Sequence, residues 1–187
     1  MKWISKILAL VFMLTLWTGV SEAASAETID NGPELARVKR LAIAYPDYYK
    51  TLEKEPEMND FINMLYEAAK VSRSYIISYD EMAAKIQQDT GIDIRVLPKM
   101  DARKIFKEHV YKYADAYMVA TLANNSRISL FFDIYAVNTN EHIYSVQVQG
   151  GKSDETKNVK TYKTMAEECY RNFDKAAQSE AKKKKDE

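Results

Sequence analysis

Apolar residues recur along this chain with two periods, one typical of strands and the other typical of helices. The run VKRLAIAY, residues 38–45, predicts a central strand that ends at Pro46, whereas the polar stretch 47–57 predicts a loop. Apolar positions spaced by three and four residues at 58–69 predict a helix. The same reasoning gives the next four elements, which are a short strand at 74–78, a helix that begins with a capping box at 78–81 and runs through Gln88, a short strand at 92–97 and a helix at 102–113.

Three strands then follow in quick succession, separated by asparagine-rich turns. They are predicted at 116–122, 127–137 and 142–149, with turns at 124–126 and 138–141. A final helix is predicted at 158–181, where apolar side chains form one stripe at helical spacing. The order β-α-β-α-(β)-α-β-β-β-α implies one α/β domain at residues 38–178, with a mixed sheet and helices packed on it, α+β-like in its closing meander.

Residues 1–26 have the features of a secretory signal peptide. Two lysines precede an apolar stretch at 7–20, and Ala24-Ser25-Ala26 predicts cleavage after Ala26, with Ser21-Glu22-Ala23 as a second acceptable site. The apolar stretch is shorter than the ~20 residues that a membrane-spanning helix needs, which favours cleavage over an uncleaved membrane anchor, the alternative.

The segments on either side of the predicted domain are expected to be irregular. Residues 27–37 contain Asp30-Asn31-Gly32-Pro33, a composition typical of a linker. Residues 179–187 predict a charged, flexible tail, in which Lys182, Lys183, Lys184 and Lys185 could make a weak contact with anionic lipid or cell-wall polymer.

The composition narrows the function classes. The 187 residues hold 27 Lys and Arg against 27 Asp and Glu, so no overall basic field exists to attract nucleic acid. A hydrophobic content of 47% is enough to form a packed core. The one cysteine, Cys169, excludes an intramolecular disulfide and a zinc site made of several cysteines.

Residues able to carry out chemistry are few and scattered. His109 and His142 do not form the zinc motif HExxH, and we expect both at the surface or half-buried. Cys169 falls in the apolar stripe of the last helix, which favours a buried thiol over a nucleophile. Helix capping and solvation explain the carboxylate pairs Asp80/Glu81 and Glu167/Glu168. We therefore expect no catalytic centre, metal or cofactor, although two carboxylates from distant segments could still form a hydrolase site.

The order of elements resembles the small envelope domains of the TolB N-terminal and CsgG-like group. The resemblance rests on the opening strand at 40–44, the strand-to-helix passage at 75–81, the segment Ala114-Asp115-Ala116-Tyr117-Met118-Val119 and the meander at 128–148. It implies a periplasmic or cell-envelope protein whose sheet face or edge binds another envelope protein.

The meander also places aromatic side chains where an exposed strand face should be polar. If the apolar set that includes Phe132 faces the core, Phe131 and Tyr135 lie on the other face, and Tyr117 and Val119 lie together on the preceding strand. Either a helix or the N-terminal loop covers this face, or it is an exposed patch that binds a partner. The candidate partner-binding residues are thus Tyr117, Val119, Phe131 and Tyr135.

Together these features predict an exported, non-catalytic protein of the periplasm or cell envelope, soluble after cleavage. We expect it to act as an adaptor or assembly factor that binds another envelope protein or a second copy of itself, and not nucleic acid. The alternatives are a hydrolase of cell-wall polymer that uses dispersed carboxylates, and a small-ligand binding module that uses the tyrosine-rich surface.

Overall fold

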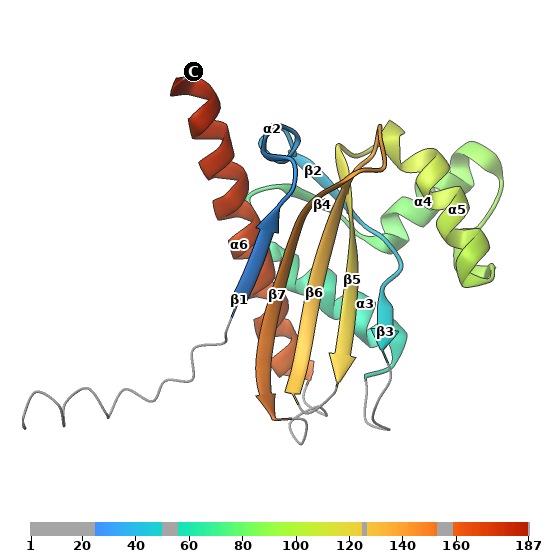
Figure 1. Ribbon diagram of the computed structural model, residues 1–187. Helices are drawn as coiled ribbons and strands as arrows, with labels where there is room; N and C mark the ends of the chain where they lie inside the picture. The colour runs from blue at the N-terminus through green and yellow to red at the C-terminus, as the bar shows by residue number, and fades with distance from the viewer. Residues whose placement is uncertain (1–24, 50–55, 125–126, 153–158, 187) are drawn as a thin grey trace, which may run out of the picture.

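A mixed sheet with helices packed on it forms the frame of the molecule (Figure 1). The computed structural model describes residues 25–49, 56–124, 127–152 and 159–186. Within these residues seven strands form one sheet in the order β1-β7-β6-β5-β2-β4, and β3 pairs with β5 off this path. The predicted α/β class, with its mixed sheet, is therefore confirmed.

The first half of the predicted domain contains the parallel strands. Its elements are β2 (Arg40–Ile43), α3 (Met58–Ala68), β4 (Tyr75–Ile77), α4 (Tyr79–Thr90) and α5 (Lys99–His109), with 3₁₀ turns at Ala69–Val71 and Val110–Lys112. Strand β2 pairs in parallel with both β4 and β5. As the capping box predicted, the Ser78 hydroxyl accepts the N–H of Glu81 at 3.1 Å, and Gly91 ends α4 in the left-handed conformation with φ +75°.

The second half is the predicted meander followed by a long helix. Strands β5 (Ala116–Asn124), β6 (Arg127–Ala136) and β7 (His142–Lys152) pair antiparallel in sequence order, and α6 spans Val159–Asp186. Asn140 takes φ +58° in the turn between β6 and β7, a conformation that asparagine adopts readily. Residues 125–126 of the other predicted turn lie outside the described residues.

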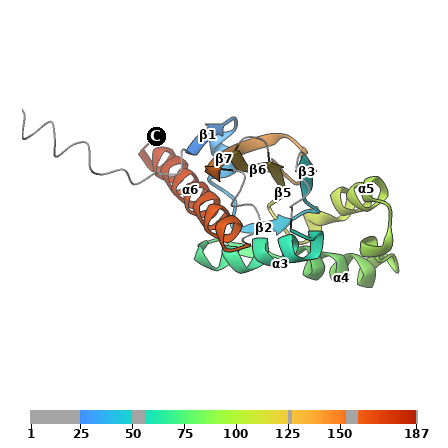
Figure 2. The same ribbon diagram turned by 90° about the horizontal axis from the view of Figure 1, so that it is seen from below.

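Two hydrophobic cores lie on opposite sides of β2. Leu41 and Ile43 belong to the core under α3 and α6, whereas Ala42 and Ala44 belong to the core under α4 and α5. Successive side chains of a strand point to opposite faces, so the two cores occupy the two faces of the sheet at β2. Figure 2 shows α6 beside α3, with α4 and α5 grouped at the far end.

The predicted linker at 27–37 is wrong for the residues that fold into β1 (Ser25–Ile29) and α2 (Gly32–Leu35). Strand β1 pairs antiparallel with β7, and the Asn31 side chain caps α2 by accepting the N–H of Glu34 at 3.1 Å. Leu35 is fully buried and anchors this segment to the first core.

Three further expectations need correction. Asp47–Tyr49, predicted as loop, forms β3 in parallel with β5. The predicted strand at 92–97 contains instead a 3₁₀ turn, η2 (Ile94–Val96), in which the Asp93 side chain accepts the N–H of Arg95 and so favours a turn over an extended chain. The tail predicted at 179–187 continues α6 as far as Asp186, with a Lys183–Glu180 ion pair of 2.6 Å one turn apart.

The predicted signal peptide lies almost entirely outside the described residues, which begin at Ser25. Ser25 and Ala26 are the first residues of β1, where Ala26 lies opposite Gln147. No helix in the described part of the chain is both long and apolar enough to cross a membrane.

Candidate functional site

The four residues predicted to bind a partner lie on one face of the meander. Tyr117 on β5 lies directly opposite Tyr135 on β6, and Val119 lies opposite Asp133. Phe131 lies two residues before Asp133 on β6 and therefore points to the same side of the sheet. We call Tyr117, Val119, Phe131, Asp133 and Tyr135 the meander face, which is turned away from α6.

Helix α5 covers one end of the meander face. The ring of Phe106 packs edge-on against Tyr117 at 5.9 Å, and Tyr117 stacks on Tyr135 with centroids 5.2 Å apart. Tyr117 is only 2% exposed, whereas Val119, Phe131 and Tyr135 are half-buried. Helix α5 therefore covers Tyr117, whereas Val119 and Tyr135 pack at the margin of the second core, and Phe131 is half-buried outside both cores.

His142 belongs to the same site, although sequence reasoning did not place it there. Its ring packs edge-on against Tyr135 at 5.3 Å, its Nδ1 lies 2.6 Å from Asp30, and its Nε2 lies 3.7 Å from Asp133. Burial raises the pKa of Asp133, an effect that the neighbouring His142 partly offsets. The histidine therefore joins the end of the meander to the segment after β1, which the sequence suggested was only a linker.

A small pocket of about 200 Å³ opens between α5 and the meander face. The side chains of Tyr117 and Tyr135 line it together with Arg103, Lys107 and Asp47. The ammonium of Lys107 lies 5.8 Å from the centre of the Tyr117 ring, a cation–π contact. Charged side chains of this pocket therefore lie beside one end of the meander face.

Asp47 fixes the relative positions of β3 and α5. Its carboxylate forms ion pairs with both Lys99 and Arg103, and Arg103 also donates to the Tyr45 carbonyl at 3.3 Å. Partial burial raises the pKa of Asp47, but the hydrogen bonds from Lys99 and Arg103 outweigh it and hold the pKa below its ordinary value. Sequence patterning gave no sign of this role because Asp47 fell in a predicted loop.

The other candidates for chemistry have structural roles. Asp80 and Glu81 lie in the first turn of α4, where negative charge favours the helix, and Glu167 pairs with Arg171 at 3.2 Å on α6. Cys169 is fully buried in the first core, as expected, and this burial raises the pKa of its thiol.

Both histidines are half-buried, as the sequence predicted. The described ranges contain no cluster of three or more His, Cys, Asp or Glu side chains that could hold a metal ion.

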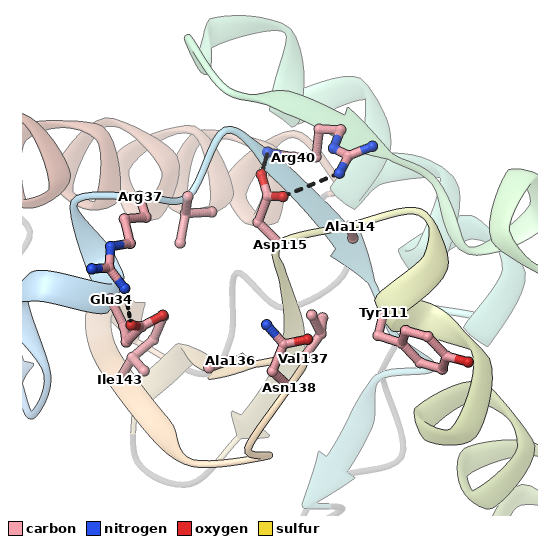
Figure 3. A pocket seen from close by; sticks show the side chains of 11 residues that line it. Glu34, Arg37, Arg40, Tyr111, Ala114, Asp115, Ala136, Val137, Asn138 and Ile143 are labelled. Atoms are coloured by element: carbon pink, nitrogen blue, oxygen red, sulfur yellow. Dashed lines mark hydrogen bonds and ion pairs between the residues drawn. The ribbon is translucent and has the colours of Figure 1, made fainter.

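A second pocket, of about 270 Å³, lies beside the first residues of β2 and β5 (Figure 3). Its charged side chains pair with one another, Arg37 with Glu34 at 2.6 Å and Arg40 with Asp115 at 3.2 Å. The Asp115 carboxylate also accepts the backbone N–H groups of Lys39 and Arg40 at 3.1 and 2.9 Å. These contacts join β5 to β2. Each of the four charged side chains named here is paired with one of opposite charge.

Comparison with known proteins gives only distant likenesses. No family model matches the chain, and no curated protein matches it. Among solved structures, it is similar to the PelC dodecamer from Paraburkholderia phytofirmans (13% identity, 84% of this chain and 98% of that chain, TM-score 0.42). It is also similar to the LpoB C-terminal domain from Escherichia coli (14% identity, 75% and 93%, TM-score 0.45) and the hypothetical protein CT253 from Chlamydia trachomatis (11% identity, 75% and 95%, TM-score 0.39). At these scores the likenesses carry no functional argument, and the resemblance to TolB N-terminal and CsgG-like domains stays a prediction.

Proposed function

We propose that this chain is an exported, non-catalytic adaptor that binds another protein of the cell envelope through its meander face. The observation that carries the proposal is the apolar group Val119, Phe131 and Tyr135, which stays only half-buried although Val119 and Tyr135 pack at the margin of the second core. A solvated sheet face is normally polar, whereas the centres of protein interfaces are enriched in aromatic residues.

Polar residues of β7 border this apolar group. Gln147 lies opposite Phe131, and Ser145 lies opposite Asp133, so a polar margin runs along the neighbouring strand. An apolar centre with a polar rim is the usual composition of an interface that forms between separately folded proteins. This arrangement supports a docking role more than a role in the protein's own core.

The residues of the meander face have two different tasks in this proposal. Tyr117 is buried between Phe106 and Tyr135, so it supports the face from within. Phe131 and Tyr135 keep part of their surface accessible and would touch the partner directly. Replacing Tyr117 should therefore affect stability, whereas replacing Phe131 should affect binding.

Export rests on the signal peptide predicted at residues 1–26. Cleavage after Ala26 would leave only Glu27, Thr28 and Ile29 of β1 on the mature chain, whereas cleavage after Ala23 would retain the whole strand. Because β1 pairs with β7 along its full length, the structure favours the earlier site. Intact-mass measurement of the exported protein distinguishes the two.

The lysines near the C-terminus give a second, weaker contact in this proposal. Lys182, Lys183 and Lys184 are exposed in the last turns of α6, where they can meet anionic lipid or cell-wall polymer.

Site-specific photo-cross-linking in cells tests the docking proposal. p-Benzoylphenylalanine is placed at Phe131 or, as the matched control, at Tyr66 on α3, an aromatic position that is 42% exposed and lies outside the meander face. We expect a discrete cross-linked protein from position 131 and not from position 66, identified by mass spectrometry as an envelope protein. A cross-link to a second copy would specify self-association through the same face.

A variant confirms that the captured contact depends on the face itself. Tyr135→Ser, shown by circular dichroism to remain folded, should strongly reduce the cross-link from position 131. The proposal fails if positions 131 and 66 capture the same products, if position 131 captures none, or if Tyr135→Ser leaves the yield unchanged.

A further inference from the structure

The helices that follow β2 and β4 pack on opposite sides of the sheet. Helix α3, which follows β2, contributes Phe61 and Leu65 to the core under α6, and its Ile62 reaches the edge of the other core. Helix α4, which follows β4, contributes Met82 and Ile86 to that other core. Strands β2 and β4 are adjacent and parallel. Where helices diverge in this way from neighbouring parallel strands, a crevice forms beyond the carboxyl ends of the strands, and such crevices commonly bind ligands.

A pocket of about 460 Å³ lies at this crevice. Tyr45 lines it from the segment after β2, Asn59 and Asn63 from α3, and Tyr79 and Asp80 from the start of α4. The volume falls within the range of about 300–1,000 Å³ that is usual for small-molecule sites. Two amides, a carboxylate and two phenols supply hydrogen-bonding groups to this lining.

Tyr79 provides an independent indication that this pocket takes a polar ligand. The residue is only 4% exposed, and its hydroxyl has no hydrogen-bond partner among the described residues. Burial raises the pKa of Tyr79 to about 12, so the hydroxyl is neutral and able to donate. A buried hydroxyl without a partner is unfavourable, and because Tyr79 also lines the pocket, a small movement of its side chain would bring the hydroxyl to a polar ligand and relieve this cost.

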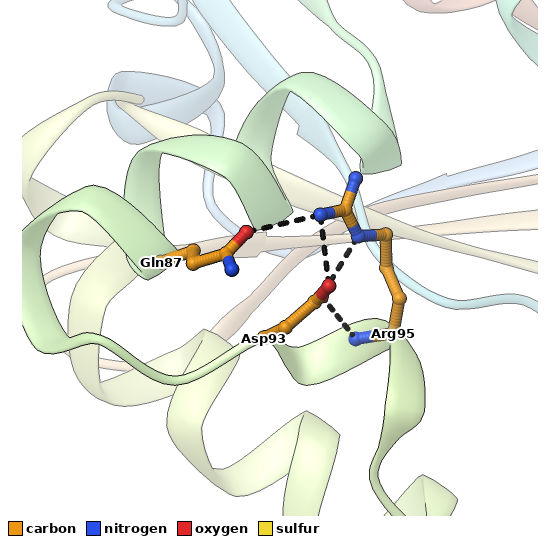
Figure 4. Close-up of polar contacts among 3 residues, drawn as sticks. All are labelled: Gln87, Asp93 and Arg95. Carbon is orange, nitrogen blue, oxygen red and sulfur yellow. Dashed lines mark hydrogen bonds and ion pairs between the residues drawn. The ribbon is translucent and has the colours of Figure 1, made fainter.

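The charged side chains around the pocket favour a neutral ligand over an anionic one. Arg95, which also lines it, is already bound to Asp93 at 2.7 and 2.9 Å and to Gln87 at 3.1 Å (Figure 4). Its positive charge is therefore compensated, and the exposed carboxylate of Asp80 adds a negative charge at the rim. A phosphate or carboxylate would meet repulsion from Asp80 without gaining an unpaired cation.

We infer that this crevice binds a neutral, hydroxyl-rich small molecule, a sugar of one or two rings. The amides of Asn59 and Asn63 can each donate to and accept from ligand hydroxyls, while Asp80 accepts hydrogen bonds from them. The ring of Tyr45, packed edge-on against Tyr79 at 5.4 Å, offers an apolar wall for the C–H face of a sugar. This site uses none of the residues of the meander face, so it is a second binding function.

Titration of the ¹⁵N-labelled full chain with N-acetylglucosamine and with glucose, followed by NMR, tests the inference. We expect at least one of these sugars to shift the amide signals of Tyr45, Asn63 and Tyr79 saturably, with the signals of α6 unchanged. Glucose 6-phosphate should bind more weakly than the tighter-binding of the two sugars. The inference is overturned if neither sugar gives saturable shifts at these residues, or if the phosphate ester binds more tightly.

Matched amide variants locate the site. Asn63→Ala, at an exposed position of α3, should weaken sugar binding by about five- to tenfold, the effect of one lost hydrogen bond. Asn138→Ala, in the exposed turn between β6 and β7, should leave the affinity unchanged. Equal effects of the two substitutions would overturn the inference, as would an unchanged affinity in Asn63→Ala.

Discussion

Two substitutions of Tyr117 separate the contributions that this residue makes to the meander face. Its hydroxyl donates to the Asn140 side chain, while its ring contacts Tyr135 and Phe106. Asn140 is exposed, so water can satisfy its amide when the hydroxyl is removed. We therefore expect Tyr117→Phe to lower the free energy of unfolding by about 1 kcal/mol, the usual net value of one hydrogen bond.

Tyr117→Ala should be far more damaging because it also removes a ring that is 2% exposed. Truncation of a buried aromatic side chain to Ala typically costs about 3–5 kcal/mol, a total that includes the two ring contacts. Urea unfolding followed by circular dichroism measures both variants, with an unchanged slope indicating that the transition is the same. If Tyr117→Ala costs no more than Tyr117→Phe, the packing of α5 on the meander face is refuted.

Three further predictions concern contacts away from the meander face. Asp174 on α6 is buried and accepts hydrogen bonds from the Ser72 hydroxyl at 3.1 Å and the Arg73 amide at 2.7 Å, so Asp174→Ala should cost about 2–3 kcal/mol of unfolding free energy; a loss below about 0.5 kcal/mol would contradict this role. Partial burial raises the pKa of Asp115, but hydrogen bonds from the backbone amides of Lys39 and Arg40 and from the Arg40 guanidinium outweigh it and lower the pKa. The stabilisation by Asp115 is therefore present above about pH 4, the ordinary pKa of an aspartate, and is lost as the pH falls through the lowered pKa. Asp115→Asn should therefore flatten the acid dependence of the unfolding free energy, and an unaltered profile would argue against the contact. Cys169, fully buried with its pKa raised, should react with a thiol reagent only in urea, and rapid labelling of the native protein would be inconsistent with the core packing.

The elements that the sequence predicted well are those with strong local signals. Helix α3 follows from apolar spacing alone, α4 from its capping residues, and the meander from asparagine-rich turns between apolar runs. In each case the residues that determine the element are close together in the chain. Local pattern therefore agrees with the final fold.

The missed strands depend on partners far away in the chain. All five residues of β1 are exposed, so burial of an apolar face does not determine this strand. It is held by main-chain pairing with β7, more than 100 residues later in the chain. Strand β3 has only three residues and is likewise fixed by pairing with a distant strand, β5. Short edge elements of this kind are decided by tertiary pairing, which local propensity does not reveal.

Part of the candidate site was predictable because it lies on strands with strong local sequence patterns. Strand alternation correctly placed Phe131 and Tyr135 on one face, and the hairpin brought Tyr117 beside them. The contributions of Asp47 and His142 were not predictable, because they depend on how β3, α5 and the segment after β1 pack around the meander.

Hydroxyl-radical footprinting tests the docking role of the meander face most directly. Oxidation of Phe131 and Tyr135 is measured in the purified protein and again in intact cell envelopes, with Tyr75 and Tyr111, exposed by 59% and 53%, as internal references. If another protein covers the meander face, Phe131 and Tyr135 lose several-fold in oxidation rate in the envelope while the two reference tyrosines change little. Equal rates for Phe131 and Tyr135 in both preparations, or equal protection of all four residues, would contradict a specific interface at this face.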